Sequence, residues 1–515
     1  MTTAQWFVFF LIVQVIHFLG TWKLYVKAGR KAWEAIIPIH NAIVLMRIIN
    51  RPTWWVILLF IPIVNLIMLP VIWVETLRSF GKNTRMDTIL GVVTLGFYIY
   101  YVNYTQDVTH IKDRSLKPKN PASDLVSSLF FAVVVATIVH TYIMQPFTIP
   151  TSSLEKTLLV GDYLFVSKFH YGARIPSTAV AFPMVHDTIP VINTKSYLNK
   201  PQYPYFRFPG IQKVKKNDIV VFNWPVDTVR YFRDTKSVGI RKPIDKKSNY
   251  VKRCVGTPGD SLSIKDGDVY INGTKLILSN RAKPQTSYIV KTDGTPLNGA
   301  YLQKELKITD NVINISQDNT TFLFQSMTED AANRLKNFPN ILSVEKNVSR
   351  DPEAGIFPYT NKWNGDNFGP IYIPEAGKTV ALNTATLPFY KMIIQEYEGN
   401  DLKVNGNEIR INGQVATTYT FKQDYYWMMG DNRHNSEDSR YWGYVPANHI
   451  VGKPVFIWLS LDQYEKGFNK IRWDRMFTTV SGDGEPQSYF KLFLIFVAGW
   501  VVVDYFVKKR KKNKA

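Results

Sequence analysis

The sequence predicts α-helical transmembrane segments joined to a mostly-β domain that lies outside the membrane. Two observations predict this fold class. Five apolar runs, four in the first third of the chain and one near its end, approach the roughly 20 residues that a spanning helix needs. Between the fourth and fifth runs, short β-branched and aromatic stretches end at turn-forming residues, as strands do. The chain has 515 residues, 46% of them hydrophobic, which suffices for a large folded domain as well as membrane segments.

The apolar runs define the expected membrane segments. They cover residues 4–24, 54–76, 89–104, 125–144 and 492–507. The first run is not a cleavable signal peptide, because no basic residue precedes it and Lys23 and Lys27 follow it. We expect it to be an anchor whose N-terminus lies outside.

Basic flanks set the expected topology, because short cytoplasmic loops carry an excess of Lys and Arg. Residues 23–51, residues 112–119 and the tail from Lys508 fall inside. This gives four spans, an outer domain over residues 145–487, a fifth span and an inner tail. One loop departs from the rule, because its basic residues would lie outside; they are Arg78, Lys82 and Arg85. Alternatively, residues 33–49 dip into the membrane and change the number of spans.

Charge and cysteine content narrow the function classes. A net charge of +21 suits nucleic acid, but the basic residues gather beside apolar segments and form no stripe interleaved with aromatic residues. We therefore expect an anionic membrane surface as partner and no nucleic acid. The one cysteine, Cys254, cannot form an internal disulfide. The sequence has no His/Cys/Asp cluster with ligand spacing, so no metal or other cofactor is expected.

The outer domain is expected to be rich in β-strands. The stretches "DIVVFNWP" (218–225) and "YVKRCVG" (250–256) indicate strands. "DVYINGTKLIL" and "NEIRINGQV" each place Asn-Gly between apolar runs, which is a strong hairpin signal. A helical period is visible only near residues 329–337. Between Asp260 and Asp424 the sequence carries no nameable chemistry, so an inserted second β subdomain is expected there.

A hydroxyl-rich segment, "PFTIPTSSLEKTLLVGD", follows the fourth apolar run and lies close to the expected outer membrane surface. A serine hydroxyl is a weak nucleophile and needs an adjacent base. His434 is the histidine near a motif, but its charged loop favours a surface position. A lysine can serve only if burial keeps it neutral near pH 7. In a strand, Lys252 would share a face with Tyr250 and Cys254, a poorly hydrated setting, while Arg253 would point the other way.

Four stretches in this order carry a family resemblance: "PTSSL", "NDIVVFNWP", "YVKRCVGTPGD" and "MMGDNRHNSEDSRYWGYVPANHIVGK". Together they resemble bacterial type I signal peptidases, the membrane-bound serine proteases that remove signal peptides from exported proteins. The family pattern Pro-Ser-x-Ser-Met, laid on residues 150–154, implies that Ser153 is the nucleophile and Thr151 the oxyanion-hole hydroxyl. The lysine of the pattern Tyr-x-Lys-Arg, here Lys252, is the implied general base.

A third family pattern, Gly-Asp-Asn-x-x-x-Ser-x-Asp-Ser-Arg, implies the supporting residues. It matches Gly430, Asp431, Asn432, Ser436, Asp438, Ser439 and Arg440. By this match Ser436 would hydrogen-bond the base lysine, while Asp431, Asp438 and Arg440 would hold the loop.

Three residues near the nucleophile depart from the family pattern. Thr151 replaces a serine but keeps a hydroxyl donor for the oxyanion. Leu154 replaces a methionine of similar apolar character. Glu155 and Lys156 replace a stretch that often contains proline, which affects the chain path after the nucleophile.

The resemblance also implies the fold, the location and the partners. It implies a signal-peptidase/LexA-like β fold with a large inserted β-rich subdomain. The expected domains are a multi-span membrane region (1–122), a transmembrane anchor (123–145), a catalytic domain in two parts (146–260 and 424–487), the insert (261–423) and a C-terminal span with a basic tail (488–515). The expected function is signal peptidase I, a serine endopeptidase with a Ser/Lys dyad, on the outer, periplasmic face of the bacterial cytoplasmic membrane. Its partners would be signal peptides of exported preproteins, membrane lipids and the secretion machinery.

Three alternatives remain open on the sequence. Ser153 and Lys156 form a literal S-x-x-K, the motif of penicillin-recognising acyltransferases, but the strings S-D-N and K-T-G do not occur and Gly161 follows too soon for the long helix of that motif. A catalytically degenerate scaffold or binding protein would lack a dyad member, and both members are present. A self-cleaving repressor of the Ser-Lys type would be soluble and carry a DNA-binding domain, against which the apolar runs argue.

Overall fold

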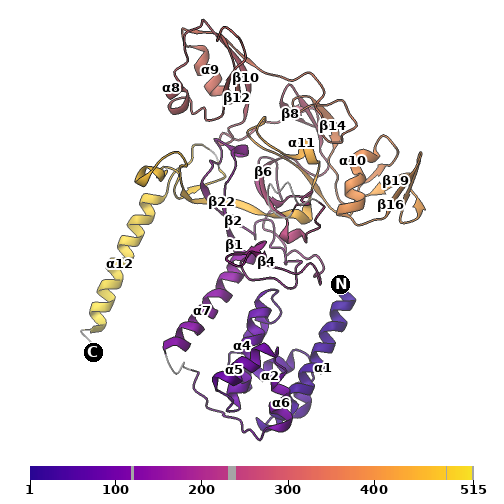
Figure 1. The fold of residues 1–515 in the computed structure, drawn as a ribbon, viewed down its shortest axis with the longest axis vertical. Coiled ribbons are helices and arrows are strands. Elements are labelled where there is room, and N and C mark those ends of the chain that lie inside the picture. Colours follow the sequence, from indigo (N-terminus) through magenta and orange to yellow (C-terminus); the bar gives the residue numbers. More distant parts are fainter. Residues whose placement is uncertain (117–120, 230–238, 483, 513–515) are drawn as a thin grey trace. The chain divides into compact units, whose positions relative to one another are not determined.

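The computed structural model describes residues 1–515 except 117–120, 230–238, 483 and 513–515 (Figure 1). The chain forms two compact units. Unit 1 comprises Met1–Met144, Ala173–Phe208 and Arg241–Lys246, and unit 2 comprises Gln145–Gly172, Pro209–Ile240 and Lys247–Ala515.

Unit 1 is mainly helical. Its helices are α1 (Thr3–Lys27), α2 (His40–Ile48), α3 (Trp55–Leu58), α4 (Val64–Ser79), α5 (Arg85–Val93), α6 (Tyr98–Thr105) and α7 (Pro121–Ile138), which a π-helical turn over Val139–Ile143 continues. In the part of the chain that the structure describes, three helices are long and apolar enough to cross a membrane: Thr3–Lys27, Pro121–Ile143 and Phe490–Arg510.

Two of the five expected spans are not single helices in the structure. The run at 54–76 is split into α3 and α4, because Ile63 adopts a left-handed conformation (φ 70°) in which a helix cannot continue. The run at 89–104 is split into α5 and α6 at Leu95 and Gly96, which both have positive φ. The short pieces instead pack into the core of unit 1.

Arg78, at the end of α4, shares a carboxylate partner with two other arginines of unit 1. The buried carboxylate of Glu75 pairs with Arg51 at 2.9 Å, with Arg114 at 2.6 Å and with Arg78 at 3.5 Å. The expectation that a membrane separates Arg78 from the basic segment at 23–51 was therefore wrong. It followed from counting the run at 54–76 as one span.

The segment Ala173–Phe208 joins the helices of unit 1. Trp6, near the start of α1, stacks on Tyr203 with ring centroids 4.5 Å apart and donates its indole N–H to the carbonyl of Gln202 at 2.9 Å. Ile63 packs with two further residues of this segment. The segment also carries a small hairpin of β3 (Thr188–Ile189) and β4 (Thr194–Lys195). One end of α1 and the turn before α4 thus meet the same stretch of chain.

Unit 2 is built on an eight-stranded sheet. Its order is β1 (Met144–Thr148), β2 (Asp162–Ser167), β22 (Ile450–Ser460), β5 (Ile219–Asn223), β6 (Asn249–Gly256), β20 (Tyr425–Met429) and β21 (Val445–Pro446), with β23 (Thr478–Thr479) beside β22. All five residues of β5 and all five of β20 are buried, as expected of interior strands covered on both faces. β6 lies between these two strands, and its last five residues, 252–256, are buried.

The segment 261–423 mixes strands with helices. One sheet contains β7 (Ser261–Lys265), β8 (Asp268–Ile271), β9 (Thr274–Lys275) and β14 (Phe368–Tyr372). A second module runs β10 (Gln285–Thr292), α8 (Gly299–Lys304), β11 (Val312–Asn314), β12 (Thr321–Thr328), α9 (Glu329–Lys336) and β13 (Ile341–Lys346). Its strand order β11-β12-β10-β13, all antiparallel, is the split β-α-β arrangement. The helix near 329–337 is confirmed.

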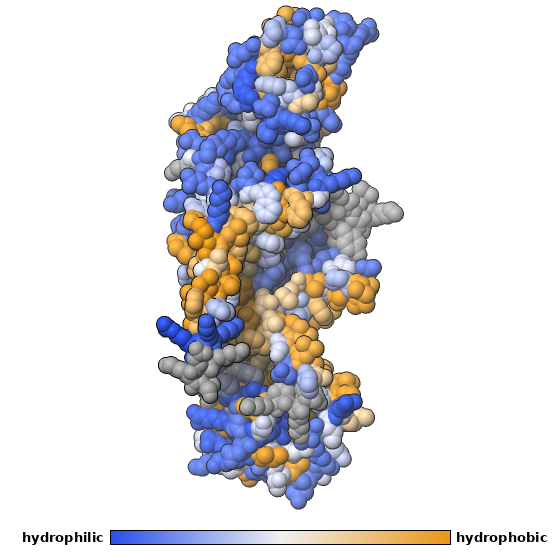
Figure 2. Space-filling model, turned by 90° about the vertical axis from the view of Figure 1, so that its left-hand side faces the viewer, coloured by the Kyte–Doolittle hydropathy of each residue, from blue (hydrophilic) through white to orange (hydrophobic). Residues whose placement is uncertain are grey.

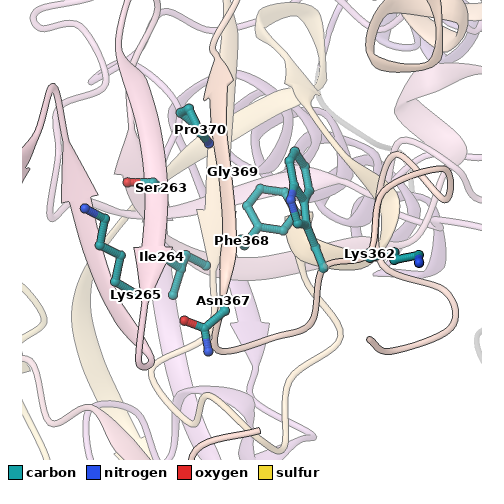
Figure 3. Close-up of a pocket in the computed structure, with 9 residues that line it drawn as sticks. Ser263, Ile264, Lys265, Lys362, Asn367, Phe368, Gly369 and Pro370 are labelled. Carbon is teal, nitrogen blue, oxygen red and sulfur yellow. The ribbon is translucent and has the colours of Figure 1, made fainter. Parts of the chain in front are cut away.

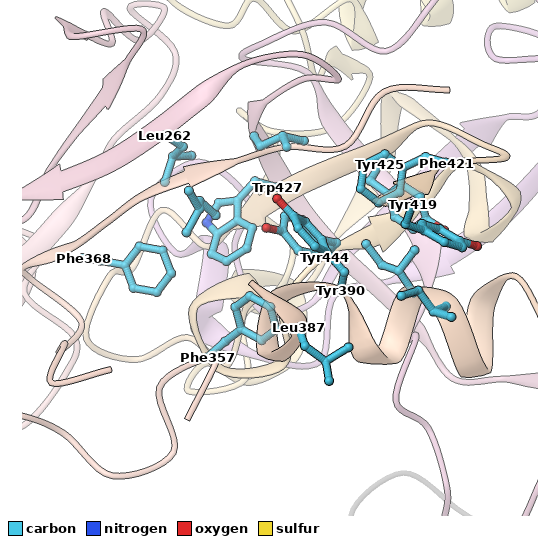
Figure 4. Close-up of a cluster of buried hydrophobic side chains, with 14 of the residues drawn as sticks. Leu262, Phe357, Phe368, Leu387, Tyr390, Tyr419, Phe421, Tyr425, Trp427 and Tyr444 are labelled. Atoms are coloured by element: carbon cyan, nitrogen blue, oxygen red, sulfur yellow. The ribbon is translucent and has the colours of Figure 1, made fainter. Parts of the chain in front are cut away.

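The remaining elements of this segment are short. They are β15 (Thr379–Ala381), α10 (Leu387–Met392), β16 (Leu402–Asn405), β17 (Glu408–Ile411), β18 (Gln414–Val415) and β19 (Thr418–Thr420). An aromatic core joins them to the end of β20 (Figure 4). Within it Trp427 contacts Phe357, Phe368 and Tyr444 with ring centroids 5.3–6.0 Å apart. This packing fixes the strand from which the candidate site loop emerges.

The C-terminal helix α12 (Phe490–Lys512) begins against an aromatic cluster of unit 2. The Phe477 ring lies 5.5 Å from Phe490 and 4.5 Å from Phe493, centroid to centroid. Beyond this contact the helix exposes apolar side chains, seen in Figure 2 as an orange column that ends in blue basic residues. An exposed apolar helix of this length suits a lipid environment.

Candidate active site

The candidate nucleophile lies on a tight turn shortly after β1. Ser152–Leu154 form a single 3-10 turn, and Thr151 is its N-cap residue with an extended backbone. Ser153 is only 9% exposed, and Leu154 behind it is buried. The Thr151 hydroxyl does not cap the turn. Its expected role in holding an oxyanion stays a prediction.

Lys252 lies on β6 and reaches the Ser153 hydroxyl. Its Nζ donates to Ser153 Oγ at 2.6 Å, and its side chain is 3% exposed. The amine lies 5.5 Å from the centre of the Tyr250 ring, on the strand face that also carries the buried Cys254. Arg253 pairs with a different partner, as strand alternation predicts. The contact brings together the two residues that the sequence singled out.

The surroundings of Lys252 favour its neutral form. Burial lowers the pKa of Lys252 to about 8, although the carboxylates of Asp438 and Glu437 act in the opposite direction. Burial disfavours an ammonium ion because the ion loses its hydration. Near neutral pH a useful fraction of the amine is therefore unprotonated, and a neutral amine can accept the hydroxyl proton of Ser153 over the same 2.6 Å contact.

Two buried ion pairs hold the candidate loop, residues 430–440, in place. Asp431 accepts two hydrogen bonds from Arg253, both at 2.7 Å. Asp438 accepts two from Arg440, both at 2.9 Å, and one from the backbone N–H of Gly430 at 3.0 Å. The arginine partners hold the pKa of both carboxyls below the usual range despite burial, which alone would raise it. Charge pairing of this kind explains how so many ionised groups stay buried.

Gly430 allows the loop to pass close to the nucleophile. A Cβ atom at this position would lie 2.6 Å from the carbonyl oxygen of Ser153 and 2.2 Å from Ser436 Oγ. Ser436 is itself buried, and among the described residues its Oγ has no hydrogen-bond partner. The expected hydrogen bond from Ser436 to Lys252 is thus not among the contacts of this structure, and that role stays a prediction.

Lys156 occupies a different environment from Lys252. Its Nζ donates to Thr309 Oγ1 at 3.1 Å and lies 3.9 Å from Glu155 Oε1. Burial lowers its pKa, and Glu155 opposes this effect. Lys156 also has a positive φ of 69° and follows a turn of three residues, so no helix brings its side chain back over Ser153. The geometry of the S-x-x-K motif is absent around these described residues.

Sequence reasoning missed the contacts that residues 261–423 make with the loop. His434, expected at the surface, contacts Asp366 through Nε2 at 3.0 Å and accepts the backbone N–H of Ser287 at Nδ1, also at 3.0 Å. Gln285 is buried and exchanges backbone hydrogen bonds with Asp431 and Arg433. No local sequence signal could have revealed these partners, because they are more than 60 residues away along the chain.

Other possible sites lie apart from these residues. A pocket of about 370 Å³ opens between β7 and β14 and is lined by Ser263, Ile264, Lys265, Lys362, Trp363, Asn367, Phe368, Gly369 and Pro370 (Figure 3). None of its lining residues belongs to the Ser153–Lys252 pair or to the candidate loop at 430–440. Within the described part of the chain, no group of three or more His, Cys, Asp or Glu side chains could hold a metal ion.

Comparison with known proteins fits this geometry. Residues 122–331 and 373–459, more than half of the chain, match the family described as signal peptidase, peptidase S26. This chain belongs to that family. The signal peptidase I of Buchnera aphidicola from Acyrthosiphon pisum is 27% identical over 68% of this chain and 79% of its own length. The signal peptidase I of Haemophilus influenzae is 25% identical over 71% of this chain and 78% of its own length. The signal peptidase I of Helicobacter pylori 26695 is 26% identical over 69% of this chain and 92% of its own length.

Family membership supports a peptidase with signal peptidase function, and it agrees with a mostly-β domain joined to apolar helices. The N-terminal residues 33–113 match a different family, one of unknown function (DUF5684). That match covers the short helices α2 to α6 of unit 1. The S26 family match begins at residue 122, within α7.

Proposed function

We propose that this chain is a membrane-bound signal peptidase I, a serine endopeptidase that cleaves signal peptides from exported preproteins with Ser153 as nucleophile and Lys252 as general base. The observation that carries the proposal is the 2.6 Å contact between Lys252 Nζ and Ser153 Oγ in a buried setting. Family membership supports the reaction class.

The mechanism begins with proton transfer. Neutral Lys252 takes the hydroxyl proton of Ser153 as Oγ attacks the scissile carbonyl carbon, and the tetrahedral oxyanion is held by the Ser153 backbone N–H and the Thr151 hydroxyl. The ammonium of Lys252 then protonates the leaving amine as the C–N bond breaks, leaving an acyl-enzyme. Lys252 next takes a proton from water, the resulting hydroxide attacks the ester, and Ser153 leaves with the proton restored.

The remaining residues would support this dyad. We assign Ser436 the role of accepting a hydrogen bond from the ammonium form of Lys252; its buried Oγ beside Gly430, which has no hydrogen-bond partner among the described residues, supports that role. The ion pairs of Asp431 and Asp438 fix the loop around the base. The catalytic domain would have the signal-peptidase/LexA-like β fold, with residues 261–423 as an insert.

We place the catalytic domain on the outer face of a bacterial cytoplasmic membrane. In this arrangement α1, α7 and α12 cross the membrane, while α3–α4 and α5–α6 enter it from the inner side and return. The clustering of Arg51, Arg78 and Arg114 around Glu75 supports one common inner face for these loops. Signal peptides, membrane lipids and secretion machinery would then meet the outer domain.

The test uses detergent-solubilised full-length protein and a preprotein with small residues before the cleavage point. We expect cleavage at the signal-peptide junction, read by sequencing the new N-terminus of the product. Ser153→Ala and Lys252→Ala should each reduce cleavage to near background. Lys252→Arg should be equally inactive, because a guanidinium cannot lose its proton in a protein.

Two neighbours of the dyad provide matched controls. Ser152→Ala and Lys156→Ala should retain most activity, because neither side chain has a step in the mechanism. If cleavage survives Lys252→Ala but not Lys156→Ala in a folded protein, the base is the other lysine. If the wild type binds preprotein without cleaving it, the chain is a scaffold on a protease fold.

A further inference from the structure

One buried side chain connects the nucleophile turn, residues 151–154, with the segment 261–423. Asn432 is fully buried. Its backbone N–H donates to the carbonyl of Ser153 at 3.0 Å, and its Nδ2 donates to the carbonyl of Ser152 at 3.3 Å. The carbonyls of Ser152 and Ser153 therefore both accept hydrogen bonds from one residue of the loop.

The other contacts of the Asn432 amide come from the split β-α-β module. Its Nδ2 also donates to Asp310 Oδ2 at 2.9 Å, on the loop between α8 and β11. Its Oδ1 accepts the hydroxyl of Ser326, a buried residue of β12, at 2.6 Å. Because Asp310 accepts from the nitrogen of the amide and Ser326 donates to its oxygen, the amide has a single favourable orientation.

A second amide reaches the same carboxylate. Asn435 Nδ2 donates to Ser152 Oγ at 3.0 Å and to Asp310 Oδ2 at 3.4 Å. Next to Asp310, Thr309 accepts from Lys156 at 3.1 Å. Thr309 thus contacts the chain shortly after Ser153, while Asp310 is linked to Ser152 through the two asparagine amides. The hydrogen bonds of Lys156 and Asp310 are charge-assisted, which makes them the stronger kind.

We propose that Asp310 and Ser326 are positioning residues of the catalytic site, which act through the amide of Asn432 to hold the nucleophile turn in register with Lys252. This inference rests on the proposed function. Without the Asp310 carboxylate the buried Asn432 amide loses its charged acceptor, and one N–H is left without this partner, so the amide is held less firmly against the Ser152 carbonyl. A displacement of the turn by about 1 Å costs on the order of a hundredfold in rate, because the attacking atom is no longer aligned.

The test compares steady-state kinetics of full-length variants on one preprotein. Asp310→Ala should lower kcat roughly tenfold to a hundredfold and change KM less than about threefold. Asp310→Asn should lie between Asp310→Ala and wild type, because it keeps one acceptor oxygen for Asn432. Asp351→Ala, at an exposed aspartate of the same segment, is the matched control and should leave both constants unchanged.

A coupling measurement separates positioning from a general loss of stability. In an Asn432→Ala background, Asp310→Ala should cost far less than in wild type, because the shared route is already broken. Equal losses in both backgrounds, a change confined to KM, or kcat values equal to those of Asp351→Ala would each overturn the proposal. If wild type cleaves and Ser153→Ala does not, these outcomes reject only the positioning role. If Ser153→Ala cleaves as well as wild type, the proposed function itself fails.

Discussion

The charge of Glu437 offers a direct way to test whether Lys252 is the base. Glu437 is exposed at the rim of the loop, so Glu437→Gln should leave the fold intact. Its carboxylate is one of three, with those of Asp438 and Asp431, that raise the pKa of Lys252 against the larger effect of burial. Removing this negative charge should lower the pKa of Lys252 further, because the ammonium form loses a stabilising partner.

The magnitude follows from the fraction of neutral lysine. With a pKa of about 8, about 9% of Lys252 is neutral at pH 7 and about 91% at pH 9, so the wild-type rate should rise roughly tenfold between these values. Glu437→Gln should lower the pKa of Lys252, by an amount that solvent screening of this exposed carboxylate keeps modest. The neutral fraction at pH 7 then rises above about 9%, so the rate there should increase, up to a ceiling of about elevenfold that complete deprotonation of Lys252 would give.

The assay is kcat/KM for preprotein cleavage at fixed ionic strength from pH 6 to pH 10. The Glu437→Gln profile should keep its shape and plateau while its midpoint moves to lower pH. Glu465→Gln, which makes the same change at an exposed residue elsewhere in the domain, should leave the midpoint in place. A wild-type profile that is flat between pH 6 and pH 9, or a Glu437→Gln midpoint that moves upward, would refute a titrating Lys252 base.

Three further predictions concern the oxyanion, the loop and the membrane. Thr151→Ala should lose roughly 10²–10³ in kcat with little change in KM, while Thr151→Ser should be nearly silent, and comparable kinetics for both would remove the oxyanion role. Arg253→Met should lower the unfolding free energy by about 3–5 kcal/mol, because Asp431 is left buried and unpaired, and Asp431→Asn in the same chain should recover part of the lost melting temperature. Val191→Cys, at an exposed position, should react with an impermeant maleimide in intact spheroplasts, whereas Lys82→Cys should react only after permeabilisation. The reverse pattern would show that the proposed topology is inverted.

Local turn chemistry was predictable because it depends on neighbouring residues. Asn412 and Gly413 both have positive φ and join β17 to β18, and Asn272 and Gly273 do the same for β8 and β9. Such residues tolerate the left-handed conformation that a two-residue hairpin turn requires. These hairpins therefore follow from the sequence alone.

The helices of unit 1 were less predictable because hydropathy measures composition and not continuity. A window over residues 54–76 is predominantly apolar, yet the chain turns at Ile63 in a conformation that β-branched residues rarely adopt. Tertiary packing determines that turn, since Ile63 packs against residues of the segment Ala173–Phe208. A signal that depends on residues more than 100 positions away is invisible to a local window.

The candidate site has features that depend on neighbouring residues, which were predictable, and features that depend on distant residues, which were not. Strand alternation placed Lys252 and Arg253 on opposite faces of β6, and the two side chains indeed have different partners. The family pattern supplied Asp431 and Asp438 but not the hydrogen bonds that residues 261–423 make to the loop between them. Those bonds depend on how a module of distant residues folds, which no spacing in the sequence encodes.

The two buried arginines have a consequence for the base as well as for the loop. Asp431 and Asp438 each raise the pKa of Lys252, whereas Arg440 lowers it. A site with the same carboxylates and no Arg440 would raise the pKa of Lys252 further and so reduce the neutral fraction that can accept a proton. Pairing Asp438 with Arg440 keeps the buried hydrogen bonds of the loop while the arginine offsets part of the effect of the carboxylates on Lys252. Burial then outweighs the remaining charge effects on the pKa of the amine, so the ion pair that holds the loop also helps to keep Lys252 available as a base.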